Sequence, residues 1–223
     1  MSFPGFDPSF FTFLKQLKTH NDREWFAEHK DRFVEDVETP AREFVRAFQP
    51  KLKTISPRFV ADPRRVGGSM FRIYRDTRFS ANKAPFKTHI GLRFWHDAKG
   101  QDSVPLYYLH LEPGSVFGGA GIYHPDPAAL RKIRLAIAND TKAWKKVLGS
   151  GLELRGETLQ RVPNGFAADH PFAVDLKRKG HVVMAPFTAK DTQSPAFLNE
   201  FTDSCRRAVP LMKFLVSALD LTW

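Results

Sequence analysis

The stretch from Arg64 to His96 constrains the fold most strongly, because apolar and basic side chains alternate along much of it. It holds eight lysines and arginines but one acid, Asp76. A solvated charged surface usually includes glutamate and few aromatic rings, whereas this stretch interleaves rings with its cations. The rings are Phe71, Tyr74, Phe79, Phe86, Phe94 and Trp95. Alternation with a period of two predicts β-strands that have one apolar face and one basic face.

Three strands are expected from this alternation, at residues 69–75, 88–96 and 106–112. The segment 97–104 is typical of a hairpin loop, so the second and third strands should be antiparallel neighbours. The alternation does not predict which strand pairs with the first one. One side of this sheet is predicted to be buried beneath Phe201 or Phe214. The residues expected on that side are Phe71, Ile73, Ile90, Leu92, Phe94, Tyr107, Leu109 and Leu111.

Helical periodicity precedes and follows the predicted strands. The pair Asp7-Pro8 is typical of a helix start. Asn21 lies three residues before a glutamate, which is the spacing of a capping box and predicts a second start. Pro40 can open a third helix, which Pro50 would bend or end. The later elements expected are helices at 127–138, 141–148 and 172–178, a buried strand at 181–188, and a long helix at 195–221 bent near Pro210.

The order of these elements predicts the fold class. Helices come first, a mostly antiparallel sheet follows, and further helices close the chain, so the expected fold is α+β with the sheet packed against N-terminal and C-terminal helices. Parallel strands would need crossover connections, and none is evident between residues 69 and 121. No internal repeat or long linker divides the sequence, so residues 1–223 are expected to form a single domain.

Charge and composition narrow the function without identifying it. The formal net charge is +10, which favours anionic partners such as phosphorylated metabolites or nucleic acid. The single cysteine, Cys205, excludes an intrachain disulfide and a multi-cysteine zinc site. No apolar run approaches the length of a membrane span, and the N-terminus does not resemble a secretion signal. We therefore expect a cytoplasmic protein with no membrane partner.

Several long sequence blocks carry a family resemblance. The central one is FRIYRDTRFSANKAPFKTHIG at residues 71–91. Supporting blocks are NDREWFAEHKDRF at 21–33, GGAGIYHPDP at 118–127, the pair Ile133-Arg134, and PNGFAADHPFAVDLKRKG at 163–180. Together they resemble domain of unknown function 2461, over nearly the whole chain. This family brings no known activity. Where its pattern reads Asp-Lys-Thr-Pro-Tyr-Lys, this chain has Asn82 and Phe86 in place of the acid and the tyrosine, so no role is expected for either group.

The polar faces of the three predicted strands converge on one surface, which is the candidate site. Cations that share a face repel one another, and they need acids from elsewhere in the chain or a bound anion to offset them. Arginine binds phosphate in a two-pronged fashion, and histidine or tyrosine can donate to the same oxygens. The loop 76–87 is expected to fold over this surface. The candidate ligand-binding residues are Arg72, Tyr74, Arg75, Arg78, Lys83, Lys87, His89, Arg93, Tyr108, His110, Gly118, Gly119 and Gly121.

The glycines at 118, 119 and 121 have two interpretations, which are a bulge or turn and the close approach of a ligand. Their spacing matches neither the phosphate-binding P-loop nor the dinucleotide fingerprint. His89, His110 and Asp76 are the candidate proton carriers if the protein is an enzyme. The sequence has no nucleophile elbow or HExxH motif, and it predicts no metal ligands and assigns no cofactor.

Three functional hypotheses follow from the basic surface. The favoured one is a pocket for a phosphate-bearing small molecule or nucleotide, with catalysis left open. A single-stranded nucleic-acid-binding module is the second, and it would bind with a steep dependence on salt. The third is a non-catalytic interaction domain whose cations are paired internally with acids. The acids available for such pairing are Asp169, Asp175, Glu112 and Glu24.

Overall fold

The first helix begins where the sequence supplies a cap. The computed structural model describes residues 3–98 and 103–223. In it α1 (Pro8–Thr19) follows Asp7, whose carboxylate accepts a hydrogen bond from the Ser9 backbone N–H at 2.8 Å. Proline at the first helical position needs no N–H partner. The predicted helix start is therefore confirmed.

The second helix, α2 (Arg23–Glu28), is capped one residue later than predicted. The Asp22 carboxylate accepts the Trp25 backbone N–H at 2.8 Å, so Asp22 and not Asn21 is the cap. The Asn21 side-chain amide instead makes two hydrogen bonds with the backbone of Phe86, both of 3.0 Å. Asn21 thereby fastens the N-terminal helices to the segment that leads into the sheet.

A continuous helical run follows, made of α3 (Lys30–Arg32), the π-helical η1 (Phe33–Glu38) and α4 (Thr39–Ile55). Pro50 lies inside α4 and does not end it, contrary to one predicted outcome. The physical reason is that Pro50 is on the exposed side, whereas Phe48 and Leu52 on either side of it are fully buried. Burial of these side chains outweighs the backbone hydrogen bond that one proline removes.

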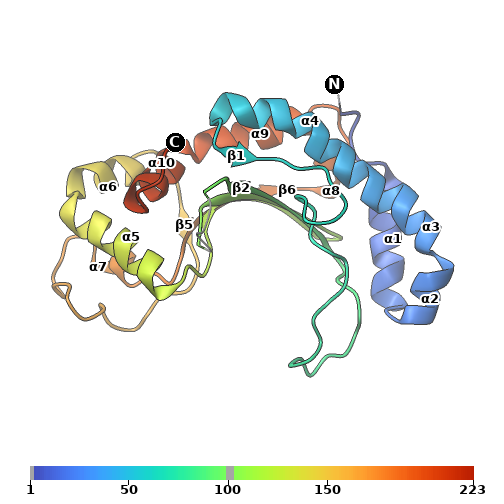
Figure 1. Cartoon of the computed structure of the whole chain (residues 1–223), viewed down its shortest axis with the longest axis horizontal. Coiled ribbons are helices and arrows are strands. Elements are labelled where there is room, and N and C mark those ends of the chain that lie inside the picture. Colours follow the sequence, from blue (N-terminus) through green and yellow to red (C-terminus); the bar gives the residue numbers. More distant parts are fainter. Residues whose placement is uncertain (1–2, 99–102) are drawn as a thin grey trace.

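The sheet has six strands in the order β1-β2-β3-β4-β6-β5, and all of its pairings among the described residues are antiparallel. This confirms the α+β class. The strands are β1 (Phe59–Val60), β2 (Ile90–His96), β3 (Leu106–Glu112), β4 (Ser115–Ile122), β5 (Leu154–Arg155) and β6 (His181–Phe187). Figure 1 shows the sheet as an arch, with α4 and α9 (Phe197–Arg207) above its convex face.

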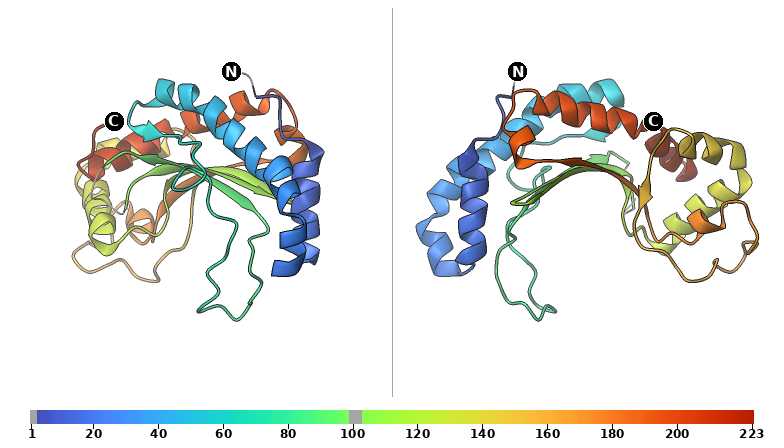
Figure 2. Two further views of the ribbon diagram at one scale, coloured as in Figure 1. Left: turned by 45° about the vertical axis from the view of Figure 1, so that its right-hand side comes forward. Right: turned by 180° about the vertical axis from the view of Figure 1, so that it is seen from behind.

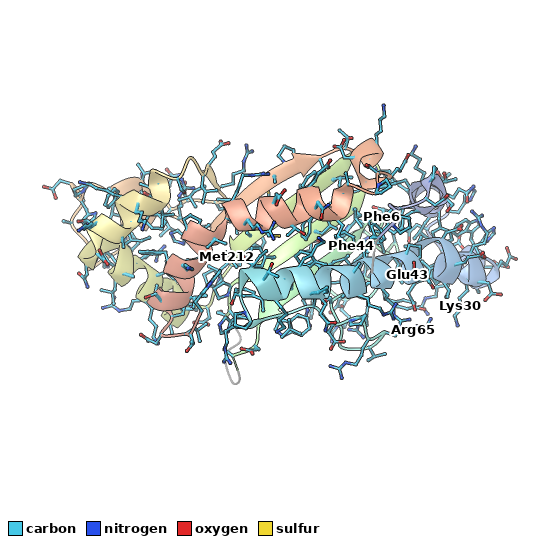
Figure 3. The ribbon with its side chains drawn as sticks, turned by 90° about the horizontal axis from the view of Figure 1, so that it is seen from above. Phe6, Lys30, Glu43, Phe44, Arg65 and Met212 are labelled. Atoms are coloured by element: carbon cyan, nitrogen blue, oxygen red, sulfur yellow. The ribbon has the colours of Figure 1, made fainter. Side chains whose placement is uncertain are left out.

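The convex face of the sheet builds the main core. Figure 3 shows α4 and α9 lying side by side above it, with Phe44 of α4 between the two helices. Phe94 packs against Phe48 and Phe201, with ring centroids 4.7 and 5.9 Å apart. The predicted cover by Phe201 is thus confirmed. The buried residues predicted correctly on this face are Ile90, Leu92, Phe94, Tyr107, Leu109 and Leu111.

The first predicted strand, 69–75, is not a strand in the structure. It contributes isolated bridges at Met70, which pairs with Leu92, and at Tyr74. Because Met70 takes the position beside Leu92, the next residue, Phe71, lies on the opposite face and is 39% exposed. The prediction that Phe71 is buried was therefore wrong, although Ile73 is buried as expected. Because Phe71 is exposed and Ile73, two residues on, is buried, the segment does not alternate regularly between two faces as a strand does.

The glycine-rich segment forms a regular strand, β4, which pairs with β3 on one side and β6 on the other. Gly118 faces α9, and a Cβ at this position would lie 3.2 Å from the Phe201 ring and 3.3 Å from that of Phe187. At Gly121, where φ is +132°, a Cβ would collide with the His181 carbonyl oxygen. Gly118 allows close packing of α9 on β4, and Gly121 allows close pairing of β4 with β6. The bulge or turn, which was one of the two interpretations, does not form.

The two ends of the arch are helical lobes. One lobe contains α1, α2 and α3, and the other contains helices from the middle of the chain together with the last helix (Figure 2). The predicted terminal helix is divided at Ala208, and Phe214 packs on Trp144 in this lobe instead of on the sheet. No helix in residues 3–98 or 103–223 is long and apolar enough to cross a membrane. The helices of the second lobe are α5 (Pro127–Asn139), α6 (Thr141–Leu148), α7 (Ala173–Leu176) and α10 (Val209–Ala218). The short α8 (Ala189–Thr192) lies at the other end of the arch, where the Phe6 backbone N–H donates to the Thr192 carbonyl at 2.8 Å.

His181 at the start of β6 is fully buried, and neither ring nitrogen has a hydrogen-bond partner among the described residues. Burial lowers the pKa of this imidazole to about 4, and Arg178 and Arg134 lower it further while Asp175 opposes the shift. The folded protein therefore keeps His181 neutral at a pH at which the unfolded chain binds a proton.

We predict that His181 makes the fold sensitive to acid. Stability is lost as the pH falls from about 6.5, the pKa in the unfolded chain, towards 4, and the loss from this group reaches about 2–3 kcal/mol near pH 4.5. Urea unfolding at pH 7 and pH 4.5 should show a smaller loss for His181→Phe than for the parent. Equal losses in the two proteins would contradict this assignment.

Candidate functional site

The register of the strands decides which side chains share the concave face. Arg93 of β2 is paired with Tyr108 of β3, and Tyr108 is paired with Gly119 of β4. In the adjacent row, Gly91 is paired with His110 and His110 with Phe117. Paired residues point to the same side of a sheet. The convergence of β2 and β3 on one polar face is thus as the alternation predicted.

Gly91 makes room for the other side chains of this face. A Cβ at Gly91 would lie 2.6 Å from the Tyr108 hydroxyl and 3.0 Å from the Phe71 ring. Phe71 also donates its backbone N–H to the Gly91 carbonyl at 3.0 Å. Phe71 and Tyr108 therefore both lie over the bare backbone of Gly91, and Phe71 becomes part of the face that it was predicted to avoid.

Two cations lie beside the Phe71 ring. The Arg93 guanidinium carbon is 5.3 Å from the Phe71 centroid and 5.0 Å from that of Trp95, and the Lys87 Nζ is 5.6 Å from the Phe71 centroid. The Lys87 ammonium also donates to the Arg72 carbonyl at 2.7 Å. Burial lowers the pKa of Lys87, and the neighbouring charge of Arg72 lowers it further. Aromatic faces thus hold both cations in place.

Neither Lys87 nor Arg93 forms an ion pair within residues 3–98 and 103–223. Two of the acids proposed for internal pairing have partners other than Lys87 and Arg93. The Asp175 carboxylate accepts from Trp144 and Arg178, and Glu112 accepts from Thr88 and lies against His110. The charge of these two cations is therefore available to an external anion.

His89, His110 and Glu112 form a cluster at the end of the same face. The two imidazole rings have centroids 4.6 Å apart. The His110 Nε2 is 3.3 Å from the Glu112 Oε2, and the His110 Nδ1 is 3.1 Å from the Tyr108 hydroxyl oxygen. The Thr88 hydroxyl donates to the second carboxylate oxygen of Glu112 at 3.1 Å. This cluster can act as an acid–base group or as a set of metal ligands.

The surroundings set the charge of this cluster. Burial lowers the pKa of His89, and the nearby His110 lowers it further while Glu112 opposes the shift. Burial raises the pKa of Glu112, but hydrogen bonds from His110 and Thr88 outweigh it, so the net shift is downward. Burial, followed by the charge of Glu112, raises the pKa of Tyr108 to about 12. The cluster therefore favours a neutral His89 beside an ionised Glu112.

A pocket of about 540 Å³ adjoins the cluster. Its walls are mostly apolar and aromatic, which suits the non-polar part of a small ligand. Gly119 lies at its floor, and a Cβ there would make an ordinary 3.6 Å contact with Tyr108. The other principal lining residues are Phe71, Leu106, Tyr108, Phe117, Val182 and Met184.

Other candidate residues lie away from this face. Arg72 lines a second pocket of about 210 Å³ together with Arg42 and Arg65, whereas Arg93 lies against the Phe71 and Trp95 rings. Tyr74, 59% exposed, lines that second pocket as well. Arg75 donates to the carbonyl of Ala84 at 3.1 Å within its own loop. The physical reason is again that 69–75 leaves the sheet edge, so alternation no longer fixes the directions of these side chains.

The loop 76–87 does not fold over the polar face as predicted. Figures 1 and 2 show it extending from the concave side, with its tip away from the strands. Two of its charged side chains bond within the loop, since Arg78 pairs with Asp76 at 2.7 Å and the Lys83 ammonium donates to the Thr77 carbonyl at 3.0 Å. The Arg78 hydrogen bonds lower the pKa of Asp76. Asp76, Arg78 and Lys83 are thus not brought to the cluster, whereas Lys87 is.

Sequence reasoning missed Glu112 and Phe117 as members of the site. The spacing of His110 and Glu112, two apart in a strand, was a usable signal because it places both on one face. The β2–β3 pairing then sets His89 next to Glu112, since Ile90 is paired with Leu111. Phe117 stacks on the His110 ring with a centroid distance of 4.7 Å, a contact that only the β3–β4 register reveals.

The fold and the site define an α+β protein with an arched sheet and a histidine-rich concave face. A model of the family described as a conserved hypothetical protein, DUF2461, matches residues 9–214. The chain belongs to this family, as its sequence blocks indicated. No curated protein and no solved structure matches it.

We predict that Gly91→Ala destabilises the fold by about 1–3 kcal/mol, because the added methyl group overpacks Tyr108 and Phe71. Gly119→Ala, on the same face, is the matched control, and its Cβ has room. Both changes reduce the entropy of the unfolded chain equally, so their difference isolates the clash. Urea unfolding measures it, and equal stabilities of the two variants would contradict the packing described for this face.

Proposed function

We propose that the concave face binds a small molecule that carries a phosphate group and an apolar or aromatic part, such as a nucleotide. The observation that supports this most directly is the presence of two cations without an acidic partner among the described residues, Lys87 and Arg93, beside the Phe71 ring. Phe71 also lines the apolar pocket. A phosphate at the cations would therefore leave the rest of the molecule next to the pocket walls.

The charges favour an external anion over internal pairing. Burial of a cation without a counterion is unfavourable, and an arginine held by two rings keeps its donor groups free for a phosphate oxygen. His89 and Tyr108 add further hydrogen-bonding groups to this face. The proposal includes the cytoplasmic location expected from the sequence, where phosphorylated metabolites are abundant.

A single-stranded nucleic acid is the second candidate occupant. The rings and the two cations, Lys87 and Arg93, would suit it, but the helical lobes flank the concave side at both ends of the arch (Figure 2) and would interrupt a long strand crossing the face. A bounded pocket fits a small molecule better. The amino-acid sequence assigns no reaction, so the proposal is one of binding. If the protein is an enzyme, His89 and His110 are the candidate proton carriers.

We predict that adenosine monophosphate raises the melting temperature of the EDTA-treated parent by roughly 2–5 °C at about ten times its Kd. Arg93→Met and Lys87→Met should fold, because each removes a repelling charge, and they should lose the shift. Arg131→Met, at an exposed position on α5, should keep it. Inorganic phosphate and adenosine should be tested separately. A shift with phosphate reports binding at the cations, and a shift with adenosine reports binding in the pocket.

The alternatives give different results. Strong destabilisation of both variants together with an unresponsive parent would mean that these cations are structural. A shift that survives in both variants would place the anion elsewhere. Tighter binding of oligo(dT) than of the mononucleotide, falling steeply with salt, would replace the small molecule with single-stranded nucleic acid.

A further inference from the structure

Two histidines and one glutamate meet on the concave face, and anion binding at Lys87 and Arg93 does not explain why. His89 precedes β2 by one residue, and His110 and Glu112 alternate along β3. We propose that His89, His110 and Glu112 form a binding site for a divalent transition-metal ion. The sequence predicted no metal ligands because His89 is far along the chain from His110 and Glu112 and becomes their neighbour only through the pairing of β2 with β3.

The spacing of the three side chains suits one ion. One potential ligand atom from each residue lies within 4.8 Å of the other two. Two ligands bound to the same ion at about 2.1 Å are roughly 3.0–3.4 Å apart at octahedral or tetrahedral angles. The 3.3 Å between the His110 Nε2 and the Glu112 Oε2 already meets this requirement.

His89 can supply the third ligand by a small rotation. Its side chain is half-buried, and no hydrogen bond holds it within the described part of the chain. A change of rotamer therefore breaks no existing bond. By contrast, His110 is fixed on several sides, by Tyr108, Glu112 and the stacked Phe117 ring.

Outer contacts orient the proposed ligands as they do in metal sites. The Tyr108 hydroxyl lies 3.1 Å from the His110 Nδ1, so it can accept the proton of this nitrogen while the Nε2 binds the ion. The Thr88 hydroxyl donates to the Oε1 of Glu112, so the Oε2 points towards His110. Groups of this kind fix the orientation of imidazole and carboxylate ligands.

The donor set indicates the class of metal. Two imidazoles and one carboxylate suit zinc or ferrous ion, whereas magnesium and calcium prefer oxygen ligands throughout. Three protein ligands leave coordination positions for water or for an atom of a bound molecule, which distinguishes catalytic from structural zinc sites. A divalent ion with one carboxylate has a net charge of +1, so the site would favour an anionic fourth ligand.

Metal binding can be tested on tag-free protein stripped with EDTA and dialysed. Zinc titrated by calorimetry should bind at one ion per chain, and cobalt should give visible absorption bands that report its ligand geometry. His89→Gln and Glu112→Gln should each weaken zinc binding at least tenfold. His20→Gln and Glu200→Gln are matched controls at exposed positions, and they should bind zinc as the parent does.

Further variants separate a ligand from an outer contact. Tyr108→Phe should keep one zinc per chain with a smaller loss of affinity than either ligand variant shows. A large excess of magnesium should not displace zinc. Melting curves without metal identify which variants fold, and either ligand variant alone decides the question if the other does not fold.

The proposal is overturned if the stripped parent binds no zinc, or if the folded ligand variants bind zinc as tightly as the controls. It does not rest on the phosphate proposal, because that shift is measured in EDTA and depends on Lys87 and Arg93. Each proposal can therefore fail while the other stands.

Discussion

The antiparallel pairing of β2 with β3 is the constraint on which the concave face depends. It sets Arg93 beside Tyr108 and Gly91 beside His110, and it brings the residue before β2, His89, next to Glu112. A shift by one residue would send every one of these side chains into the core and bring Leu92 and Phe94 into solvent. Burial of the apolar face therefore fixes the polar one.

Gly91 and Phe71 then shape the surface that the register creates. The missing side chain at Gly91 admits Tyr108 and Phe71, and Phe71 in turn supports Lys87 and Arg93. The apolar pocket is lined by Phe71, which supports the two cations, and by Tyr108 and Phe117, which contact His110. A bound ion at the cluster and a phosphate at the cations would act on the same occupant, which gives the two proposals a common physical basis in attraction of an anion.

Local signals in the sequence predicted much of the fold. Asp7-Pro8 marks a helix start through a hydrogen bond to a nearby backbone N–H, and alternation marks β2 and β3 because their apolar sides are fully buried. These features depend on neighbours in the chain. The faces of Arg93, Tyr108 and His110 were predictable for the same reason.

Contacts between distant segments were not predictable in this way. The segment 69–75 makes only isolated bridges, at Met70 and Tyr74, so its expected alternation did not predict that Phe71 lies on the concave side. The path of the loop 76–87 depends on its internal hydrogen bonds, which no periodicity encodes. Glu112 was seen only as a possible counterion, because its approach to His89 needs the strand pairing as well as the sequence.

A crystal structure of the protein grown with zinc, with diffraction recorded on both sides of the zinc absorption edge, tests the central claim most directly. The account predicts one strong anomalous peak on the concave face, about 2.1 Å from a nitrogen of His89, a nitrogen of His110 and an oxygen of Glu112. A peak held by other residues, or none at this cluster in crystals saturated with zinc, would contradict it.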